Sequence, residues 1–156
     1  MKFQFNDGGR AVSGHIGRAK DCVTRAVAIA TGKPYQEVYD ALNRLSASER
    51  FGKRKKKKSD SESGVFRLTY QRYMESLGWK WRPTMAIGSG CRVHLRASEL
   101  PRGVLLVRVS RHLTTVVDGV IHDIHDCSRN GRRCVYGYFV PPSTTNVSPV
   151  HHNPNA

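Results

Sequence analysis

Residues 20–32, with the sequence KDCVTRAVAIATG, constrain this chain more than any other stretch. Their apolar side chains recur at the spacing of a helix that is buried on most sides. Asp21 stands where an N-cap belongs, and Gly32 where a C-cap belongs. Cys22 then lies in the first helical turn, where the positive end of the helix dipole favours the thiolate over the thiol. Cys22 is therefore either a reactive thiol or a small buried core residue.

The length of 156 residues suits one domain that can bury a core of its own. We expect that domain to span residues 1–140, with 141–156 as a disordered tail rich in Pro, Ser, Thr and Asn. No apolar run is long enough to span a membrane, and from the polar first residues we expect no signal peptide, so we expect a reducing, cytoplasmic setting. In that setting thiols or metal ligands are favoured over disulfides for Cys22, Cys91, Cys127 and Cys134.

The formal net charge of +14 predicts attraction to polyanions such as nucleic acid or acidic proteins. Consecutive cationic side chains carry a large part of it: Lys53, Arg54, Lys55, Lys56, Lys57 and Lys58. Such a run repels itself, so we expect a solvated, disordered loop at about 52–64 that interrupts the domain. Two roles stay open for this basic run: solubility alone, or contact with nucleic acid or an acidic protein partner. No aromatic residue interrupts it, so base stacking is not indicated.

Hydrophobic periodicity predicts helices first and strands afterwards, which is an α+β arrangement. The C-terminal part alternates like an antiparallel meander, with Asp118-Gly119 as a hairpin turn. In chain order the expected elements are an edge strand at 2–6, helices at 20–32, 34–50 and 66–78, and strands at 79–81, 91–95, 104–109, 111–117, 120–123 and 134–140.

The hairpin turn at Asp118-Gly119 determines which side chains share a face of the sheet. A two-residue turn pairs Thr114 with Asp123 on the neighbouring strand. Because side chains alternate between the two faces of a strand, His112 and Asp123 then lie on one face as diagonal neighbours. Such neighbours are about 7–8 Å apart at the backbone, within reach of a side-chain hydrogen bond. A carboxylate at that place can hold the imidazole in one tautomer.

Cys22, His112 and Asp123 together are the parts of an activated thiol nucleophile. In this interpretation the Cys22 sulfur attacks a carbonyl carbon. His112 takes the thiol proton and later gives a proton to the leaving group, while Asp123 orients the ring. Backbone N–H groups at the start of the helix, that of Cys22 included, stabilise the oxyanion. Taken singly, His112 could be a strand histidine bonded to a carbonyl, and Asp123 could pair with an arginine.

This pattern resembles the papain-like cysteine peptidase superfamily, because Asp21-Cys22 opens a buried helix and His112 begins a late strand that Asp123 follows. Within the superfamily it looks most like the compact bacterial peptidases that process double-glycine leader peptides, over residues 15–140. The resemblance implies a helical lobe with the cysteine packed on an antiparallel sheet, a peptide or protein substrate, and no cofactor. The phrase DCVTRAVAIATG also looks like small proteins of bacteria and their phages, which implies a host cytoplasm or a virion.

The chain departs from that family at the oxyanion donor. Members place a glutamine a few residues before the cysteine, and residues 15–20 contain none. One lost donor can cost a factor of about a hundred or more in rate. His15 and Lys20 are the side chains in this stretch that could replace it.

A zinc site is one rival interpretation, because its ligand types crowd a short stretch: His122, His125, Cys127 and Cys134. The spacing of these residues matches no well-attested zinc module. Cys127 and Cys134 could also close a loop, although a lasting disulfide is not expected in a reducing compartment. Asp126 is the alternative orienting acid, although strand parity turns it away from His112.

We therefore interpret the chain as a cysteine hydrolase, peptidase-like or amidase-like, with a triad of Cys22, His112 and Asp123 and no metal. The alternative function is a non-enzymatic basic module of the same fold that binds nucleic acid or an acidic protein partner through residues 53–58.

Overall fold

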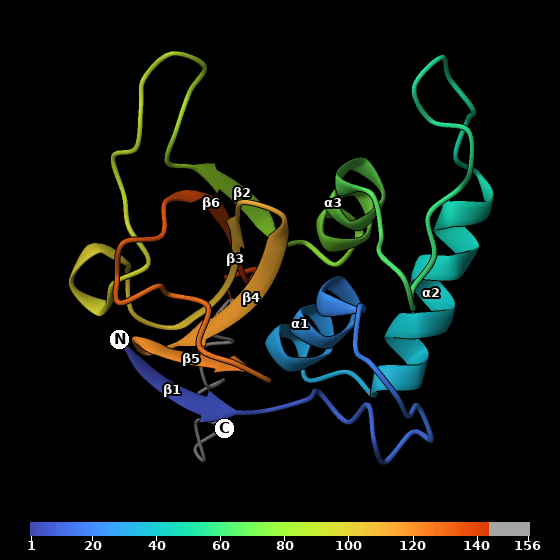
Figure 1. Cartoon of the computed structure of the whole chain (residues 1–156), viewed down its shortest axis with the longest axis horizontal. Coiled ribbons are helices and arrows are strands. Elements are labelled where there is room, and N and C mark those ends of the chain that lie inside the picture. The colour runs from blue at the N-terminus through green and yellow to red at the C-terminus, as the bar shows by residue number, and fades with distance from the viewer. Residues whose placement is uncertain (144–156) are drawn as a thin grey trace, which may run out of the picture.

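The computed structural model describes residues 1–143 and shows helices packed on one mixed sheet (Figure 1). The sheet has the strand order β1-β5-β4-β3-β6-β2. Its strands are β1 (Lys2–Phe5), β2 (Lys80–Pro83), β3 (Val104–Val109), β4 (His112–Val117), β5 (Val120–Asp123) and β6 (Val135–Val140). The helices are α1 (Cys22–Thr31), α2 (Tyr35–Ala47) and α3 (Arg67–Ser76), with a short 3-10 helix at Ala97–Glu99. The α+β prediction is confirmed.

The helix α1 lies directly against β4, in the middle of the molecule (Figure 1). Its small apolar residues Ala26 and Val27 are buried, which lets the helix approach the sheet closely. The Thr115 hydroxyl on β4 donates a hydrogen bond of 2.6 Å to the Ala26 carbonyl. The helix ends as predicted at Gly32, which adopts the left-handed conformation of a C-cap. The expected N-cap at Asp21 is wrong in one respect, since its side chain makes no capping hydrogen bond.

The helix α2 packs against α1, and α3 packs against α2 (Figure 1). Val38 and Leu42 on α2 and Met74 on α3 are buried in one cluster with Val27 of α1. Because apolar side chains from all three helices meet those of the sheet, the helices share one core with it. None of the helices in the described part of the chain has the length and apolar character needed to cross a membrane.

The hairpin register was predicted correctly, whereas the predicted antiparallel meander holds for β3, β4 and β5 but not for β6. Val117 pairs with Val120 across the Asp118-Gly119 turn, and the pairing continues back along both strands. However, β6 pairs with β3 on the far side of β4, and β1 pairs with β5 in parallel. The sheet is therefore mixed, and the strand that follows β5 in the chain is not its neighbour. Alternation along a strand reports its faces but not its partners, which is why this connection escaped prediction.

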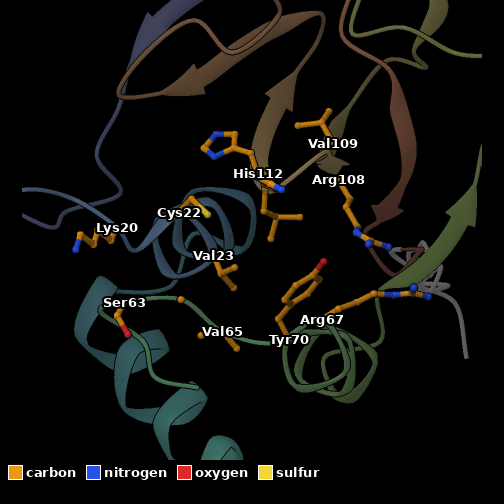
Figure 2. Close-up of a pocket in the computed structure, with 13 residues that line it drawn as sticks. Lys20, Cys22, Val23, Ser63, Val65, Arg67, Tyr70, Arg108, Val109 and His112 are labelled. Atoms are coloured by element: carbon orange, nitrogen blue, oxygen red, sulfur yellow. The ribbon is translucent and has the colours of Figure 1, made fainter. Parts of the chain in front are cut away.

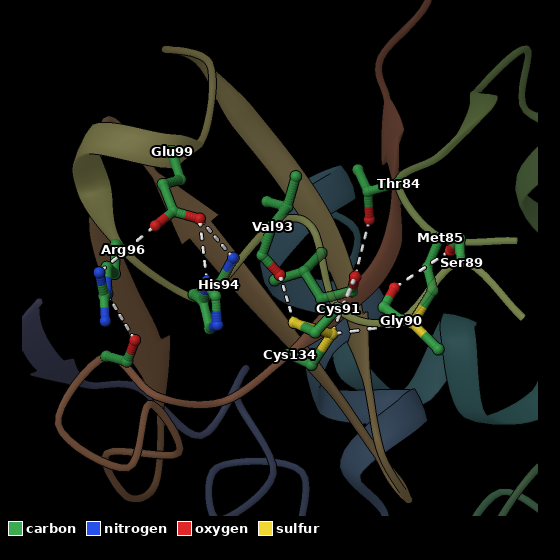
Figure 3. Close-up of a disulfide and its surroundings, with 12 residues drawn as sticks. Thr84, Met85, Ser89, Gly90, Cys91, Val93, His94, Arg96, Glu99 and Cys134 are labelled. Atoms are coloured by element: carbon green, nitrogen blue, oxygen red, sulfur yellow. Dashed lines mark hydrogen bonds and ion pairs between the residues drawn. A yellow bond between two sulfur atoms is a disulfide. The ribbon is translucent and has the colours of Figure 1, made fainter.

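Loops cover the second face of the sheet and hold a disulfide between Cys91 and Cys134 (Figure 3). The strand expected at 91–95 is absent, and only an isolated bridge joins His94 to Cys134. The prediction of thiols is wrong for these two cysteines, whose Cα atoms lie 5.7 Å apart. They are 43 positions apart in the chain, so no local spacing pointed to the pair. A disulfide is rare in a reducing compartment, the setting from which the thiols were predicted.

The segment at 52–64 has two different halves. The basic run is exposed, as expected of a solvated loop. In contrast, Ser61 is fully buried, and its hydroxyl donates a hydrogen bond of 2.6 Å to the Tyr39 carbonyl. The Ser59 backbone N–H donates a hydrogen bond of 2.7 Å to the Glu49 carboxylate. Disorder of this segment stays a prediction, and most of the expected tail, 144–156, lies outside the described residues.

The closest backbone approach in the sheet predicts a stability effect. A Cβ atom on Gly137 of β6 would lie 2.3 Å from the indole of Trp81 and 2.7 Å from the Arg82 carbonyl oxygen. We therefore expect Gly137→Ala to lower the free energy of unfolding by about 1–3 kcal/mol in chemical denaturation. Gly52→Ala is the matched control, because a Cβ atom on Gly52 would meet no other atom within 4 Å. Equal stability of the two variants would contradict this packing.

Candidate active site

Three side chains from distant parts of the chain meet beside α1. Cys22 begins α1, His112 begins β4, and Asp123 ends β5. The Nε2 atom of His112 lies 2.7 Å from an Asp123 carboxylate oxygen, so the predicted shared face is confirmed. Cys22 and His112 line the same cavity, and each shifts the pKa of the other. Figure 2 shows the sulfur and the imidazole at the edge of a common cavity.

Asp123 is held in place from several sides. The Thr114 hydroxyl donates a hydrogen bond of 2.8 Å to one carboxylate oxygen, and the Ile124 N–H donates one of 2.7 Å to the other. Burial opposes the charge on Asp123, but the hydrogen bond and charge of His112, together with the bonds from Ile124 and Thr114, outweigh it and hold the pKa of the carboxyl below its usual range. Asp123 therefore accepts from Nε2 as an anion, which leaves Nδ1 of His112 available to the Cys22 thiol.

The surroundings of Cys22 and His112 favour a negative charge on the thiol and a positive charge on the imidazole. Burial alone would lower the pKa of His112, but hydrogen bonds to Asp123, Cys127 and Cys22 raise it to about 11. Burial alone would raise the pKa of Cys22, but the bond from His112 and the N–H of Leu113 lower it below the ordinary value. These opposite shifts favour a thiolate and an imidazolium over the neutral pair.

A buried arginine connects the start of α1 to Asp123. Arg25 is 3% exposed and lies one helical turn after Asp21. Its guanidinium contacts the Asp21 carboxylate at 3.0 Å and the Asp123 carboxylate at 3.7 Å. Asp21 in turn accepts from the Arg10 guanidinium at 3.1 Å and from the Tyr35 hydroxyl at 2.5 Å. The Asp21 side chain, expected to cap the helix, instead joins this network.

The cavity beside Cys22 has a volume of about 340 Å³. Lys20, Cys22 and His112 form one side of it, Tyr70 of α3 forms another, and the segment 63–65 closes it from below in Figure 2. The cavity is large enough for part of a peptide chain. A nucleophile that opens into such a space can reach a bound carbonyl group.

The structure separates the two side chains considered as oxyanion donors. Lys20 lines the cavity with Cys22. His15 lies elsewhere, hydrogen-bonded to Gln36 at 3.0 Å and packed between the rings of Tyr35 and Tyr39. His15 is therefore no donor at this site, whereas Lys20 stays a candidate.

The basic run predicted as a binding site is not part of this cavity. None of residues 53–58 lines it, and the loop that carries them extends beyond the end of α2 (Figure 1). Two of its lysines lie over aromatic rings, Lys55 over Phe66 and Lys58 over Phe51. Binding of nucleic acid or an acidic protein partner by this run stays a prediction.

The proposed zinc ligands are not brought together. Cys134 is in the disulfide, and Cys127 instead lies with His112 and Asp123, their ligand atoms within 4.8 Å of one another. The 2.7 Å between His112 and Asp123 is a hydrogen bond, whereas two ligands of one tetrahedral zinc ion lie about 3.3 Å apart. This short distance fits a hydrogen bond between His112 and Asp123 better than it fits a metal ion held by His112, Asp123 and Cys127. Asp126, the alternative orienting acid, is exposed and caps the turn at Ser128.

Sequence reasoning missed three residues of the site. Arg25 was hidden because buried arginines are rare and its acidic partners are far apart in the chain. The helical spacing of Tyr70 indicates a core residue, and it is buried, but its ring also lines the cavity. Cys127 was visible only as a zinc ligand or loop cysteine, and its contact with His112 depends on the turn after β5. No local pattern in the sequence marks any of these contacts.

Comparisons with known proteins give no further guide to this site: no family model, no curated protein and no solved structure matches the chain.

The Arg25 network predicts a large and specific stability effect. Arg25→Ala leaves Asp21 and Asp123 buried without their shared counter-charge, so we expect the free energy of unfolding to fall by about 3–5 kcal/mol. Lys33→Ala is the matched control, because Lys33 forms an exposed ion pair with Glu37 at the same spacing along a helix. In urea denaturation, the free energy of unfolding of Lys33→Ala should stay close to that of the wild type. Similar losses in both variants would contradict the network.

Proposed function

We propose that this chain is a cysteine hydrolase that cleaves peptide or amide bonds with Cys22, His112 and Asp123. The observation that carries the proposal is that the Cys22 thiol shares a cavity with His112, whose Nε2 atom lies 2.7 Å from the buried Asp123 carboxylate. Three polar groups in this order match the roles of nucleophile, acid–base and orienting acid. Each of the three also has an environment that supports its role, as the directions of their pKa shifts indicate.

In the first half of the reaction the Cys22 thiolate attacks the carbonyl carbon of the scissile bond. A C–S bond forms, and the carbonyl electron pair moves onto oxygen. When the oxyanion collapses, the C–N bond breaks and the His112 imidazolium gives its proton to the leaving amine. The product is a thioester on Cys22 and a neutral His112 still bonded to Asp123.

In the second half, water replaces the amine. Neutral His112 takes a proton from water, whose oxygen attacks the thioester carbon. The C–S bond then breaks, which releases the acid and restores the thiolate and imidazolium. Asp123 keeps the ring oriented in both halves, because its own position is held by Thr114 and Ile124 rather than by the substrate.

The oxyanion is stabilised in this proposal by the start of α1. The Cys22 N–H belongs to the first helical residue and lies in the positive end of the helix dipole. Lys20 and the Tyr70 hydroxyl also line the cavity, so both are candidate side-chain donors. They would take the place of the glutamine that papain-like peptidases carry before the cysteine.

A papain-like relationship is the most specific form of this proposal. A cysteine on the first helix, packed against a sheet that carries the histidine and the acid, supports it. The likeness to double-glycine leader peptidases and the phage or bacterial origin rest on the sequence resemblance alone. A cytoplasmic location stays a prediction, against which the Cys91–Cys134 disulfide weighs.

The charge state of the pair predicts how Cys22 reacts with iodoacetamide. Because the pKa of Cys22 is lowered, the midpoint of its alkylation rate against pH should lie below that of an unstructured cysteine. His112→Ala removes the main cause of the lowering and leaves burial, so the midpoint should move up and the rate at pH 7 should fall by about tenfold or more. Mass spectrometry of the modified peptide measures the rate at each pH.

Cys127→Ala serves as the control for this measurement, because Cys127 is a buried free thiol that also contacts His112. Its removal should leave Cys22 labelled faster than a free thiol. With p-nitrophenyl acetate, wild type should also accumulate an acetyl group on Cys22. Labelling of Cys22 no faster than a free thiol, or unchanged by His112→Ala, would refute the proposed function.

A further inference from the structure

The cavity beside Cys22 does not end at Tyr70. A second cavity of about 310 Å³ adjoins it, and Arg67 and Arg108 line both. Figure 2 shows the two guanidinium groups side by side, on the far side of Tyr70 from Cys22. A chain bound at Cys22 can therefore continue across the two arginines into the second cavity.

The groove formed by the two cavities carries a single sign of charge. Lys20 and Arg111 line the first cavity with Cys22, and Arg67 and Arg108 line both cavities at their junction. Within residues 1–143, none of these four cations forms an ion pair with a carboxylate, and the lining of the groove contains no Asp or Glu. Like charges held close together repel each other unless an anion lies between them. The junction is thus built to receive an anionic group.

The second cavity has a different character. Apolar side chains Trp81, Met85 and Ile87 line it with the ring of Tyr136, over which Arg108 lies at 5.5 Å. Trp81 lies across Gly137, where no side chain displaces it. Ile87 is fully exposed, and together with Met85 and Trp81 it forms an exposed apolar patch of the kind that marks a binding groove.

The wall that carries Met85 and Ile87 is fixed at both ends. At one end, the Thr84 hydroxyl donates a hydrogen bond of 2.8 Å to the Val135 carbonyl on β6. At the other, Cys91 is bonded to Cys134 just before that strand (Figure 3). The apolar hollow is therefore anchored to the sheet.

We propose that the substrate is a peptide segment in which an acidic residue is followed or preceded by a bulky apolar one, with Arg67 and Arg108 binding the acid and Trp81 and Ile87 the apolar side chain. This inference rests on the proposed function, because the position of Cys22 at one end of the groove defines where the bond is cut. It concerns a surface that is separate from the basic run at 53–58. A peptide fits better than a nucleic acid, since a phosphodiester offers the thiolate no acyl carbon.

Binding to the full-length Cys22→Ala variant tests the inference without requiring catalysis. The probes are rhodamine-labelled hexapeptides with amidated ends, Gly-Gly-Glu-Trp-Gly-Gly and its reversed order, Gly-Gly-Trp-Glu-Gly-Gly. Matched peptides replace Glu by Gln or Trp by Ala. By fluorescence anisotropy, at least one order should bind about tenfold more tightly than its Gln counterpart, because a charge-assisted bond to two guanidinium groups is lost.

Two double variants with equal loss of charge separate the groove from the overall field of the protein. Arg67→Gln with Arg108→Gln should abolish the preference for Glu over Gln. Lys56→Gln with Lys57→Gln removes two exposed charges outside the groove and should leave that preference intact. Ile87→Ser, at an exposed position that does not support the core, should weaken the preference for Trp over Ala alone.

Equal loss of preference in both double variants, or no preference for Glu in either peptide order, would overturn the inference. So would tighter binding of a labelled octathymidylate than of the Glu peptides that also depends on Arg67 and Arg108, because the groove would then be a nucleic-acid site. The outcome is independent of the proposed function. A groove that selects Glu beside an unreactive Cys22 would refute the hydrolase alone, and a reactive Cys22 beside an unselective groove would refute this inference alone.

Discussion

The interaction on which the site depends is the buried contact of Arg25 with Asp21 and Asp123. It joins the residue before α1 to the last residue of β5, and therefore fixes the helix of Cys22 relative to the carboxylate bonded to His112. Two buried carboxylates would repel each other without this guanidinium. Arg25 is thus both a structural and an electrostatic link, and its position within α1 lets one helix carry the thiol and the counter-charge.

The site combines a rigid side with an adaptable one. Cys22, His112 and Asp123 come from elements with regular hydrogen bonds, so their relative positions do not depend on a substrate. The opposite wall comes from loops and from side chains on α3 and β3, and it supplies cationic and apolar surface. In this account the first side performs the chemistry and the second chooses what is cut. Part of the net positive charge then serves to bind substrate in the groove, in addition to any general attraction of the protein to polyanions.

Local patterns predicted the elements well and the long-range connections poorly. The helical spacing of 20–32 located α1, and the two-residue turn at Asp118-Gly119 gave the register that places His112 beside Asp123. The pairing of β6 with β3 and the Cys91–Cys134 bond depend on how loops run over the sheet, which periodicity does not encode. The role of Arg25 was hidden for the same reason. One partner, Asp21, precedes Arg25 by one helical turn, and the other, Asp123, lies far along the chain at the end of β5.

The most direct test of this account is the protonation state of His112, followed by NMR of its ring nitrogens as the pH is raised. The account predicts an imidazolium that persists well above pH 6.5, the ordinary midpoint, because Asp123 and the Cys22 thiolate both stabilise it. It also predicts a lower midpoint in Cys22→Ala, since one of those anions is then absent. A His112 that titrates near pH 6.5 in both proteins would contradict the thiolate–imidazolium pair.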